Sequence, residues 1–187
     1  MKTTKQGGEK GSDVIRPACA EDRAAVLAII NAAAEAYRGV IPADRWHEPY
    51  MPAEELDAEI AAGVVFSCYE TGQGIAGVMG VQRRYNADLI RHAYVLPERQ
   101  GHGLGTALIA HLCRDRERPI LVGTWRAAEW AIRFYERHGF TQVAGEDAAP
   151  LLRTYWTVPE RQIATSVVLT LPGLDREGAA RLMAGAS

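Results

Sequence analysis

Three glycines at alternate positions, Gly101, Gly103 and Gly105, constrain this chain more than any other feature of its sequence. Residues 94–96 before them are typical of a strand end, and the pattern after them predicts a helix from about Leu104. Glycine removes the Cβ atoms that would crowd successive N–H groups, and a helix start adds unpaired N–H groups and a positive dipole end. Such a loop suits a phosphate or pyrophosphate, although a glycine loop that only turns the chain is the alternative.

Two common phosphate-binding patterns do not fit this loop. A G-x-G-x-x-G fingerprint would need glycine at 106 or 108, where Thr106 and Leu108 stand. A Walker A loop ends in G-K-[ST], and that tripeptide occurs nowhere in the sequence. What remains is the pattern Gln100-x-x-Gly103-x-Gly105 directly after a predicted strand.

Composition predicts one ordinary globular domain. The 187 residues are 48% hydrophobic and 24% charged, and the net charge is −2 with both signs mixed along the chain. This charge gives no reason to expect nucleic acid or a membrane surface as a partner. The three cysteines, Cys19, Cys68 and Cys113, are too widely spaced for a disulfide framework, and no secretory signal is seen, so we expect a cytoplasmic protein.

Apolar periodicity predicts an α/β domain over residues 13–171, with a disordered tail at 1–12 and an Ala/Gly-rich tail with one weak helix at 172–187. The expected order is β-α-α-β-β-β-α-β-α-β-β. Strands are predicted at 14–16, 64–70, 75–83, 89–96, 120–124, 140–143 and 163–171, and helices at 21–37, 53–62, 104–116 and 127–138. The unit from 89 to 124 is strand, helix and strand, so its two strands should be parallel neighbours. Residues 38–53 and 145–161 are predicted to be aromatic loops, and the first forms either a satellite core cluster or a wall of a binding site.

A second motif makes a family resemblance specific. Phe134-Tyr135-Glu136-Arg137-His138-Gly139-Phe140 ends the fourth predicted helix, and its tyrosine lies 35 residues after Gln100. The loop and this motif resemble the [QR]-x-x-G-x-[GA] and F-Y-[EQ]-x-x-G-F patterns of the GNAT (GCN5-related) N-acetyltransferases, over about residues 13–171. The resemblance implies a mixed six- to seven-stranded sheet, a splayed pair of parallel strands at the cofactor site, and acetyl-CoA as cofactor.

The resemblance also implies roles for particular residues. The strand before the loop should pair with the pantetheine arm and offer a backbone N–H to the thioester carbonyl. The loop N–H groups should hold the pyrophosphate, and Gln100 should brace the loop. Tyr135 should protonate the departing thiolate. The implied cofactor contacts are Ala93, Tyr94, Val95, Leu96, Gln100, Gly101, His102, Gly103, Leu104, Gly105 and Thr106. For His102 the sequence favours a solvent-facing side chain, with a phosphate contact as the alternative.

Two positions depart from the family pattern. Ala128 stands where many members have a cofactor-contacting asparagine, and Gly123 stands where many have a glutamate base. The base is therefore expected to be another residue or a water chain. His92 is the best candidate residue, because strand alternation places it on the same face as Tyr94. A structural histidine is the alternative reading. Weaker candidates for the base are Glu70, Asp88 and Glu129, and the histidines at 47, 111 and 138 show no metal-ligand spacing.

The resemblance implies direct transfer of an acetyl group from acetyl-CoA to a primary amine. The aromatic residues of the two loops favour a small-molecule acceptor in a partly closed pocket. The candidates for its wall are Tyr37, Trp46, Tyr50, Tyr155 and Trp156. A protein or peptide acceptor, or a non-catalytic acyl-CoA-binding regulatory module, are the alternatives. A homodimer through the last strand is one assembly that the sequence allows, and no metal is expected.

Overall fold

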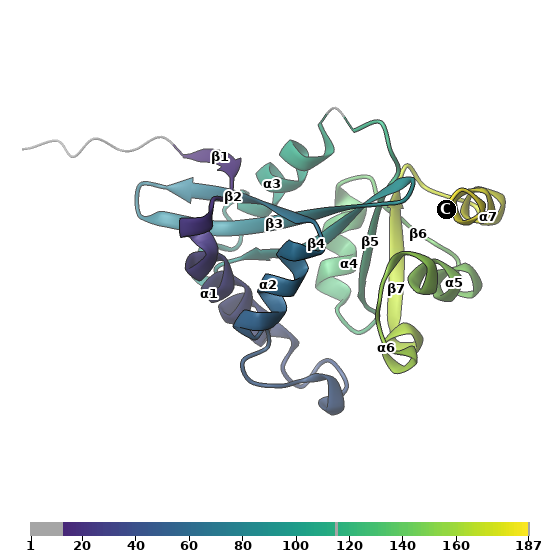
Figure 1. Ribbon diagram of the computed structural model, residues 1–187, viewed down its shortest axis with the longest axis horizontal. Helices are drawn as coiled ribbons and strands as arrows, with labels where there is room; N and C mark the ends of the chain where they lie inside the picture. Colours follow the sequence, from purple (N-terminus) through teal and green to yellow (C-terminus); the bar gives the residue numbers. More distant parts are fainter. Residues whose placement is uncertain (1–12, 115, 187) are drawn as a thin grey trace, which may run out of the picture.

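The computed structural model describes residues 13–114 and 116–186, which form a seven-stranded mixed sheet covered by helices (Figure 1). The strand order is β1-β2-β3-β4-β5-β7-β6, and only the β4–β5 pair is parallel. The strands are β1 (Val14–Pro17), β2 (Val64–Thr71), β3 (Gly74–Arg84), β4 (Ala87–Val95), β5 (Ile120–Trp125), β6 (Thr141–Gln142) and β7 (Ser166–Leu171). The predicted α/β class and mixed sheet are therefore confirmed, with β6 shorter than expected.

Helices cover both faces of this sheet. They are α1 (Arg23–Ala34), α2 (Ala53–Ala61), α3 (Leu104–Cys113), α4 (Glu129–Arg137), α5 (Gly145–Tyr155), α6 (Glu160–Thr165) and α7 (Arg176–Ala184). Short 3₁₀ turns are η1 (Ala20–Asp22), η2 (Glu35–Tyr37), η3 (Ala43–Arg45) and η4 (Pro97–Arg99). No helix within the described ranges combines the length and the apolar character needed to cross a membrane.

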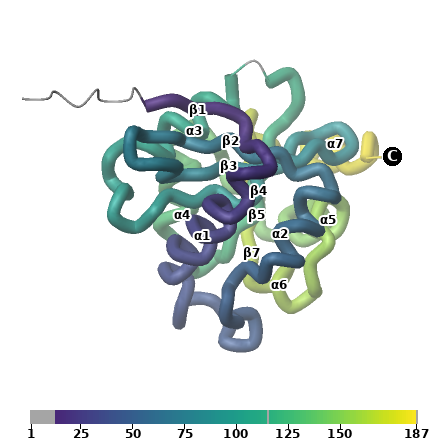
Figure 2. The backbone as a smooth tube through the Cα atoms, turned by 60° about the vertical axis from the view of Figure 1, so that its left-hand side comes forward, coloured from purple at the N-terminus to yellow at the C-terminus, as the bar shows by residue number. Residues whose placement is uncertain are grey.

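The alternation of side chains along the central strands divides the core into two layers. Leu89 and Leu121 point toward α5 and α7, whereas their neighbours Ile90 and Val122 pack against α3 and α4. Helices α1 and α2 lie side by side over β2 and β3, where Leu56 and Phe66 are buried together (Figures 1 and 2). The result is a sheet with α3 and α4 on one face and the other helices on the opposite face.

The parallel strands β4 and β5 pair over only part of their length and then separate. Asp88, Leu89 and Ile90 pair with β5 through Ile120–Val122, and no pairing is recorded beyond them. A register shift between β3 and β4 coincides with the parting, and His92 takes a left-handed backbone (φ 50°) there. An extra residue in one strand bends it and increases its twist. The predicted splayed pair is therefore present, and a bulge in β4 accompanies it.

Two predictions about the C-terminal third are wrong. Residues 145–161 are not a loop, because they contain α5 and the start of α6, and β7 begins at Ser166 rather than at 163. The cause is an apolar stripe at helical spacing, Ala148, Leu151, Leu152 and Tyr155, which is buried against β7. The helix expected after residue 171 is present as α7, and it packs on α5 through buried Leu182. The predicted tail at 1–12 lies outside the described residues.

Candidate active site

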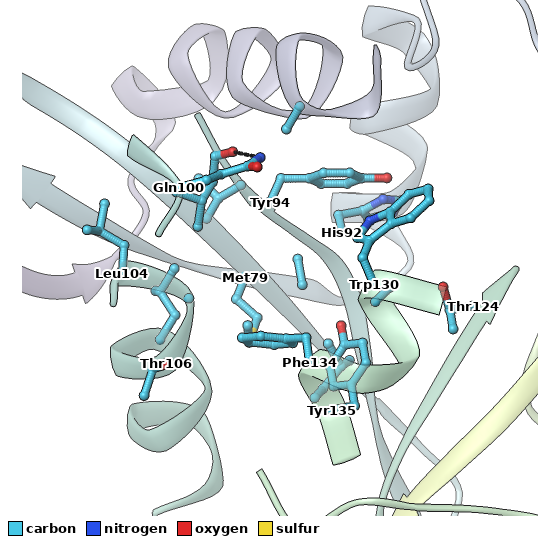
Figure 3. Close-up of a pocket in the computed structure, with 18 of the residues that line it drawn as sticks. Met79, His92, Tyr94, Gln100, Leu104, Thr106, Thr124, Trp130, Phe134 and Tyr135 are labelled. Carbon is cyan, nitrogen blue, oxygen red and sulfur yellow. Dashed lines mark hydrogen bonds between the residues drawn. The ribbon is translucent and has the colours of Figure 1, made fainter. Parts of the chain in front are cut away.

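A cavity of about 740 Å³ opens where β4 and β5 part. Its walls come from the free ends of these two strands, the glycine loop and start of α3, one face of α4, and the end of α1 with η2 (Figure 3). Its size lies within the range of small-molecule and cofactor sites. The parting of the strands therefore opens a cavity that residues from both faces of the sheet border.

The glycine loop forms one end of this cavity. Gly101 and Gly103 have positive φ values of 77° and 83°, which a side chain would strain. The first backbone bond of α3 runs from the Ala107 N–H to the Gly103 carbonyl at 2.9 Å, so the N–H groups of residues 104–106 have no acceptor within the helix. Gln100 braces the loop by donating from Nε2 to the Val95 carbonyl at 3.1 Å (Figure 3). The loop thus offers free N–H groups at a helix start, as a pyrophosphate site requires.

The free edge of β4 forms the second wall. The Leu96 N–H donates to the Ala76 carbonyl of β3 at 2.9 Å. Since successive N–H groups of a strand point to opposite edges, the Val95 N–H is directed toward the gap beside β5. Leu96 is therefore engaged with β3 and does not line the cavity, unlike Ala93, Tyr94 and Val95.

The cavity receives most, but not all, of the predicted loop residues. Gly101, Gly103, Leu104, Gly105 and Thr106 line it. His102 does not, because it is exposed and its Nδ1 lies 2.8 Å from the Gln100 carbonyl oxygen. The position of His102 therefore matches the solvent-facing expectation.

Tyr135 projects from α4 into the cavity. The residue is only 6% exposed, and its ring packs against Phe134 and Phe140, with centroids 5.2 and 5.5 Å away. Figure 3 shows its hydroxyl group pointing into the cavity, on the side of Tyr94 and Thr124. Burial, reinforced by the nearby Tyr37 phenol, raises the pKa of Tyr135 well above the usual tyrosine value. The phenol therefore keeps its proton at neutral pH and can donate it within the cavity.

His92 also reaches the cavity, from the β4 bulge. Its ring lies 6.1 Å from that of Phe66, and its Nε2 is 3.3 Å from Oε2 of Glu59 on α2. Both His92 and Tyr94 line the cavity, although a bulge rather than regular alternation brings them there. Glu59 was not a sequence candidate, and no motif marked it.

The three weaker candidates for the base lie away from the cavity. Asp88 is buried at the opposite end of β4, with Arg116 at 2.8 Å. Glu70 pairs with Arg16 at the sheet edge, and Glu129 faces solvent beside Arg133. None of the three lines the cavity.

The aromatic residues of the 38–53 segment and its neighbours form a layered wall. Tyr37 lines the cavity with Trp130, their ring centroids 5.4 Å apart. Tyr50 stacks behind Tyr37 at 6.2 Å, and Trp46 lies 5.5 Å from Tyr50. Burial raises the pKa of Tyr37 to about 12. Tyr37 is thus a wall residue, whereas Trp46 and Tyr50 support it from a satellite cluster.

Tyr155 and Trp156 belong to the core on the other face of the sheet, not to the cavity. The Tyr155 hydroxyl donates to Asn86 Oδ1 at 2.6 Å, and the residue is 1% exposed. Trp156 packs against Gly123, where a Cβ atom would lie 3.4 Å from Trp156 and 3.3 Å from Leu152. The expectation that these two residues form a wall of the acceptor pocket is therefore wrong, because α5 packs them into the core on the other face of the sheet. The same contacts leave little room for a glutamate side chain at position 123.

The fold and the sequence both match known acetyltransferases. A family model described as an acetyltransferase (GNAT) domain matches residues 61–142. No curated protein matches the chain. A GNAT family acetyltransferase from Staphylococcus aureus superposes with a TM-score of 0.63 at 17% identity, covering 85% of this chain and 98% of that one.

Two further structures were solved with cofactor. The PaiA N-acetyltransferase from Thermoplasma acidophilum, in complex with coenzyme A, gives a TM-score of 0.64 at 17% identity and covers 86% of this chain and 98% of that one. A GNAT family acetyltransferase from Brucella melitensis, in complex with acetyl-CoA, gives 0.51 at 23% identity over 70% and 83% of the two chains.

A mixed sheet whose parallel strands part beside a glycine loop defines a GNAT-type fold, and the solved structures share it. The family model adds sequence evidence over the segment that holds the loop and Tyr135. The chain thus has the GNAT fold and, over residues 61–142, matches the GNAT acetyltransferase domain model.

Proposed function

We propose that the protein is an acetyl-CoA-dependent N-acetyltransferase. One observation carries the proposal: the free N–H groups at the start of α3, the unpaired edge of β4 and the Tyr135 phenol all border one cavity. The glycine loop fits a pyrophosphate, and the β4 edge fits an extended arm that bonds like an added strand. Two structural neighbours are described with coenzyme A or acetyl-CoA, which supports the same ligand here.

Acetyl-CoA supplies an acetyl group that a thioester bond has activated. In the proposed reaction the Val95 N–H stabilises the negative charge that develops on the carbonyl oxygen. Tyr135 donates its phenolic proton to the departing sulfur, and His92 accepts a proton from the attacking amine. None of the three cysteines lines the cavity, which favours direct attack by the amine over an acyl-cysteine route.

The chemistry of the cavity also limits the acceptor. Its ionisable cations are His92, Arg99 and Arg137, and no carboxylate lines it. Trp130 and Thr124 line the same cavity as His92 (Figure 3). The additional ammonium groups of a polyamine would be buried in the cavity without a carboxylate partner, at a free-energy cost on the order of several kcal/mol for each ion. A small amine with a single amino group on an apolar or aromatic body fits this wall best.

A titration of coenzyme A followed by a thiol-release assay tests the proposal. We expect micromolar coenzyme A binding and faster acetylation of phenylethylamine than of 1,4-diaminobutane or of a peptide with a free N-terminus. Tyr135→Phe should bind coenzyme A normally and lose turnover. Binding without acetylation of any amine, unchanged by Tyr135→Phe, would favour a non-catalytic module. A preference for the peptide would favour a protein acceptor.

A further inference from the structure

A carboxylate from α2 stands directly behind His92. Glu59 reaches across from the helix, and its Oε1 accepts a hydrogen bond from Nη2 of Arg91 at 2.6 Å. Its other oxygen, Oε2, lies 3.3 Å from Nε2 of His92. The side chains of Glu59 and His92 are only 19% and 15% exposed. A charge and an imidazole are therefore held together at the back wall of the cavity.

The two facing atoms have nothing else to bond. Glu59 Oε2 and His92 Nε2 are both buried, and neither makes a hydrogen bond within the described residues, although the two atoms face each other at 3.3 Å. Arg91 occupies the first carboxylate oxygen and also donates to Gln82 Oε1 at 2.8 Å. The second oxygen is thus left for His92. Burial opposes ionisation, but the His92 imidazole and the Arg91 guanidinium outweigh it and lower the pKa of Glu59.

The backbone conformation at His92 is a second sign that this residue belongs to a functional site. A non-glycine residue with φ of 50° carries strain that the surrounding structure must hold, and such residues concentrate at functional sites. The bulge aims the ring past Phe66 toward α2, so that Nε2 meets Glu59 while the ring still borders the cavity. With Nε2 directed at Glu59, Nδ1 is the nitrogen left to serve the cavity.

We propose that Glu59 is a positioning residue for His92, an inference that rests on the proposed acetyl transfer. Glu59 accepts the Nε2–H and thereby fixes the tautomer in which Nδ1 carries a lone pair. Nδ1 then takes a proton from the acceptor ammonium, which leaves the amine lone pair free to attack. The imidazolium that forms is stabilised by the carboxylate until the proton passes to solvent.

A purely structural role for Glu59 predicts a different result. Its ion pair with Arg91 ties α2 to β4, and the loss of either partner would then weaken the fold, with Arg91→Met costing at least as much as Glu59→Met because Arg91 also donates to Gln82. Glu59→Met and Arg91→Met form a matched pair, because each removes the same ion pair with an unbranched side chain. Only the first also removes the acceptor for His92 Nε2.

The first measurement needs no cofactor. In ¹⁵N spectra of the free protein, the His92 signals are assigned by their loss in His92→Gln, and their shifts report which ring nitrogen carries the proton. We expect the Nε2–H form in the wild type and in Arg91→Met, and a mixture in Glu59→Met. An unchanged tautomer in Glu59→Met overturns the proposal. Glu59→Gln, which retains an acceptor oxygen, should preserve part of the preference and serves if Glu59→Met does not fold.

The second measurement is turnover. Glu59→Met should lower kcat on the order of tenfold with little change in the KM for the amine, a fraction of the effect of losing the base itself. Arg91→Met should leave kcat within about threefold, and Glu59→Met should add nothing in a His92→Gln background. Equal losses in the Glu59 and Arg91 variants overturn the proposal. A wild type inactive on every amine would instead refute the proposed function, whatever the tautomer.

Discussion

At the scale of single residues, two buried tyrosines are expected to have different roles, Tyr135 in catalysis and Tyr155 in stability. The Tyr135 hydroxyl points into the cavity and has no hydrogen-bond partner within the described part of the chain. Removing it should leave the free energy of unfolding within about 1 kcal/mol of the wild type, because no bond is lost. Turnover should fall about a hundredfold, since the proton donor is gone. Steady-state kinetics and thermal unfolding of Tyr135→Phe check both values, and a normal kcat would exclude Tyr135 as the acid.

For Tyr155 we expect the opposite result, a loss of stability without a loss of turnover. Its hydroxyl donates to Asn86 Oδ1 and lies 3.0 Å from the Leu182 carbonyl, and it thus links α5 and α7 to the β3–β4 turn. Tyr155→Phe should lower the free energy of unfolding by about 1–2 kcal/mol, because a buried acceptor loses its donor. Turnover at a temperature where the protein is folded should not change. A selective loss of activity would place Tyr155 at the site, contrary to its packing.

At the scale of elements, the turn between β4 and α3 depends on a left-handed glycine. An alanine at Gly103 meets no atom within 4 Å, so its cost is backbone strain alone, about 1–2 kcal/mol. Any relaxation moves the N–H groups at the start of α3. Gly103→Ala should therefore weaken coenzyme A binding by roughly tenfold. Gly63→Ala has the same strain and the same open space between α2 and β2, so calorimetry should show lower stability but unchanged affinity.

A charged link between β1 and η1 makes stability sensitive to acid. Arg16 donates to both oxygens of Asp22 at 2.6 and 2.9 Å, and these bonds with the Cys19 N–H hold the pKa of Asp22 well below its usual range. A carboxyl whose pKa is lowered on folding adds stability above its unfolded pKa of about 3.9 and loses it below. Asp22→Asn should be less stable than the wild type at pH 7, and denaturant titrations should show the difference shrinking from about pH 4 toward pH 2. A constant difference would contradict this.

Sequence reasoning located elements best where periodicity was long or a motif was local. The glycine loop, Tyr135 and the parallel pair were predictable because each depends on residues close in sequence. Helix α5 was missed because Gly145 and Pro150 resemble loop residues, although its apolar stripe has helical spacing. The aromatic rings of Tyr155 and Trp156 could not be assigned to one face of the sheet without knowing that helix.

The partner of His92 was beyond prediction for another reason. Glu59 lies 33 residues earlier, on a helix whose surface carries several acidic residues. Only the register shift in β4 turns His92 toward it. The glycines at 77 and 80 within a predicted strand do indicate a bulge or a close backbone approach, and a Cβ at Gly80 would lie 2.9 Å from the Arg91 carbonyl. The sequence does not indicate that this bulge turns His92 toward Glu59.

At the scale of the whole molecule, the sheet consists of two halves with a narrow junction. Strands β1 to β4 and strands β5 to β7 pair antiparallel within each half, and three register pairs between β4 and β5 join them. Separate clusters bury α1 and α2 against the first half and α5 and α7 against the second. A ligand in the gap would contact both halves. Because it would bind only the folded state, a ligand concentration one hundred times its Kd should raise the free energy of unfolding by about 2.7 kcal/mol.

Hydrogen exchange tests whether coenzyme A bridges the two halves. The Val95 N–H should exchange slowly only with ligand present, because its direction toward the gap leaves it unpaired without one. The N–H groups of Gly105 and Thr106 should slow as well, whereas buried Cys68 in β2 serves as an internal reference. Protection confined to Gly105 and Thr106 would mean that the cavity holds only the phosphates. Protection that includes Val95 would show that the ligand completes the edge that β4 loses where it leaves β5.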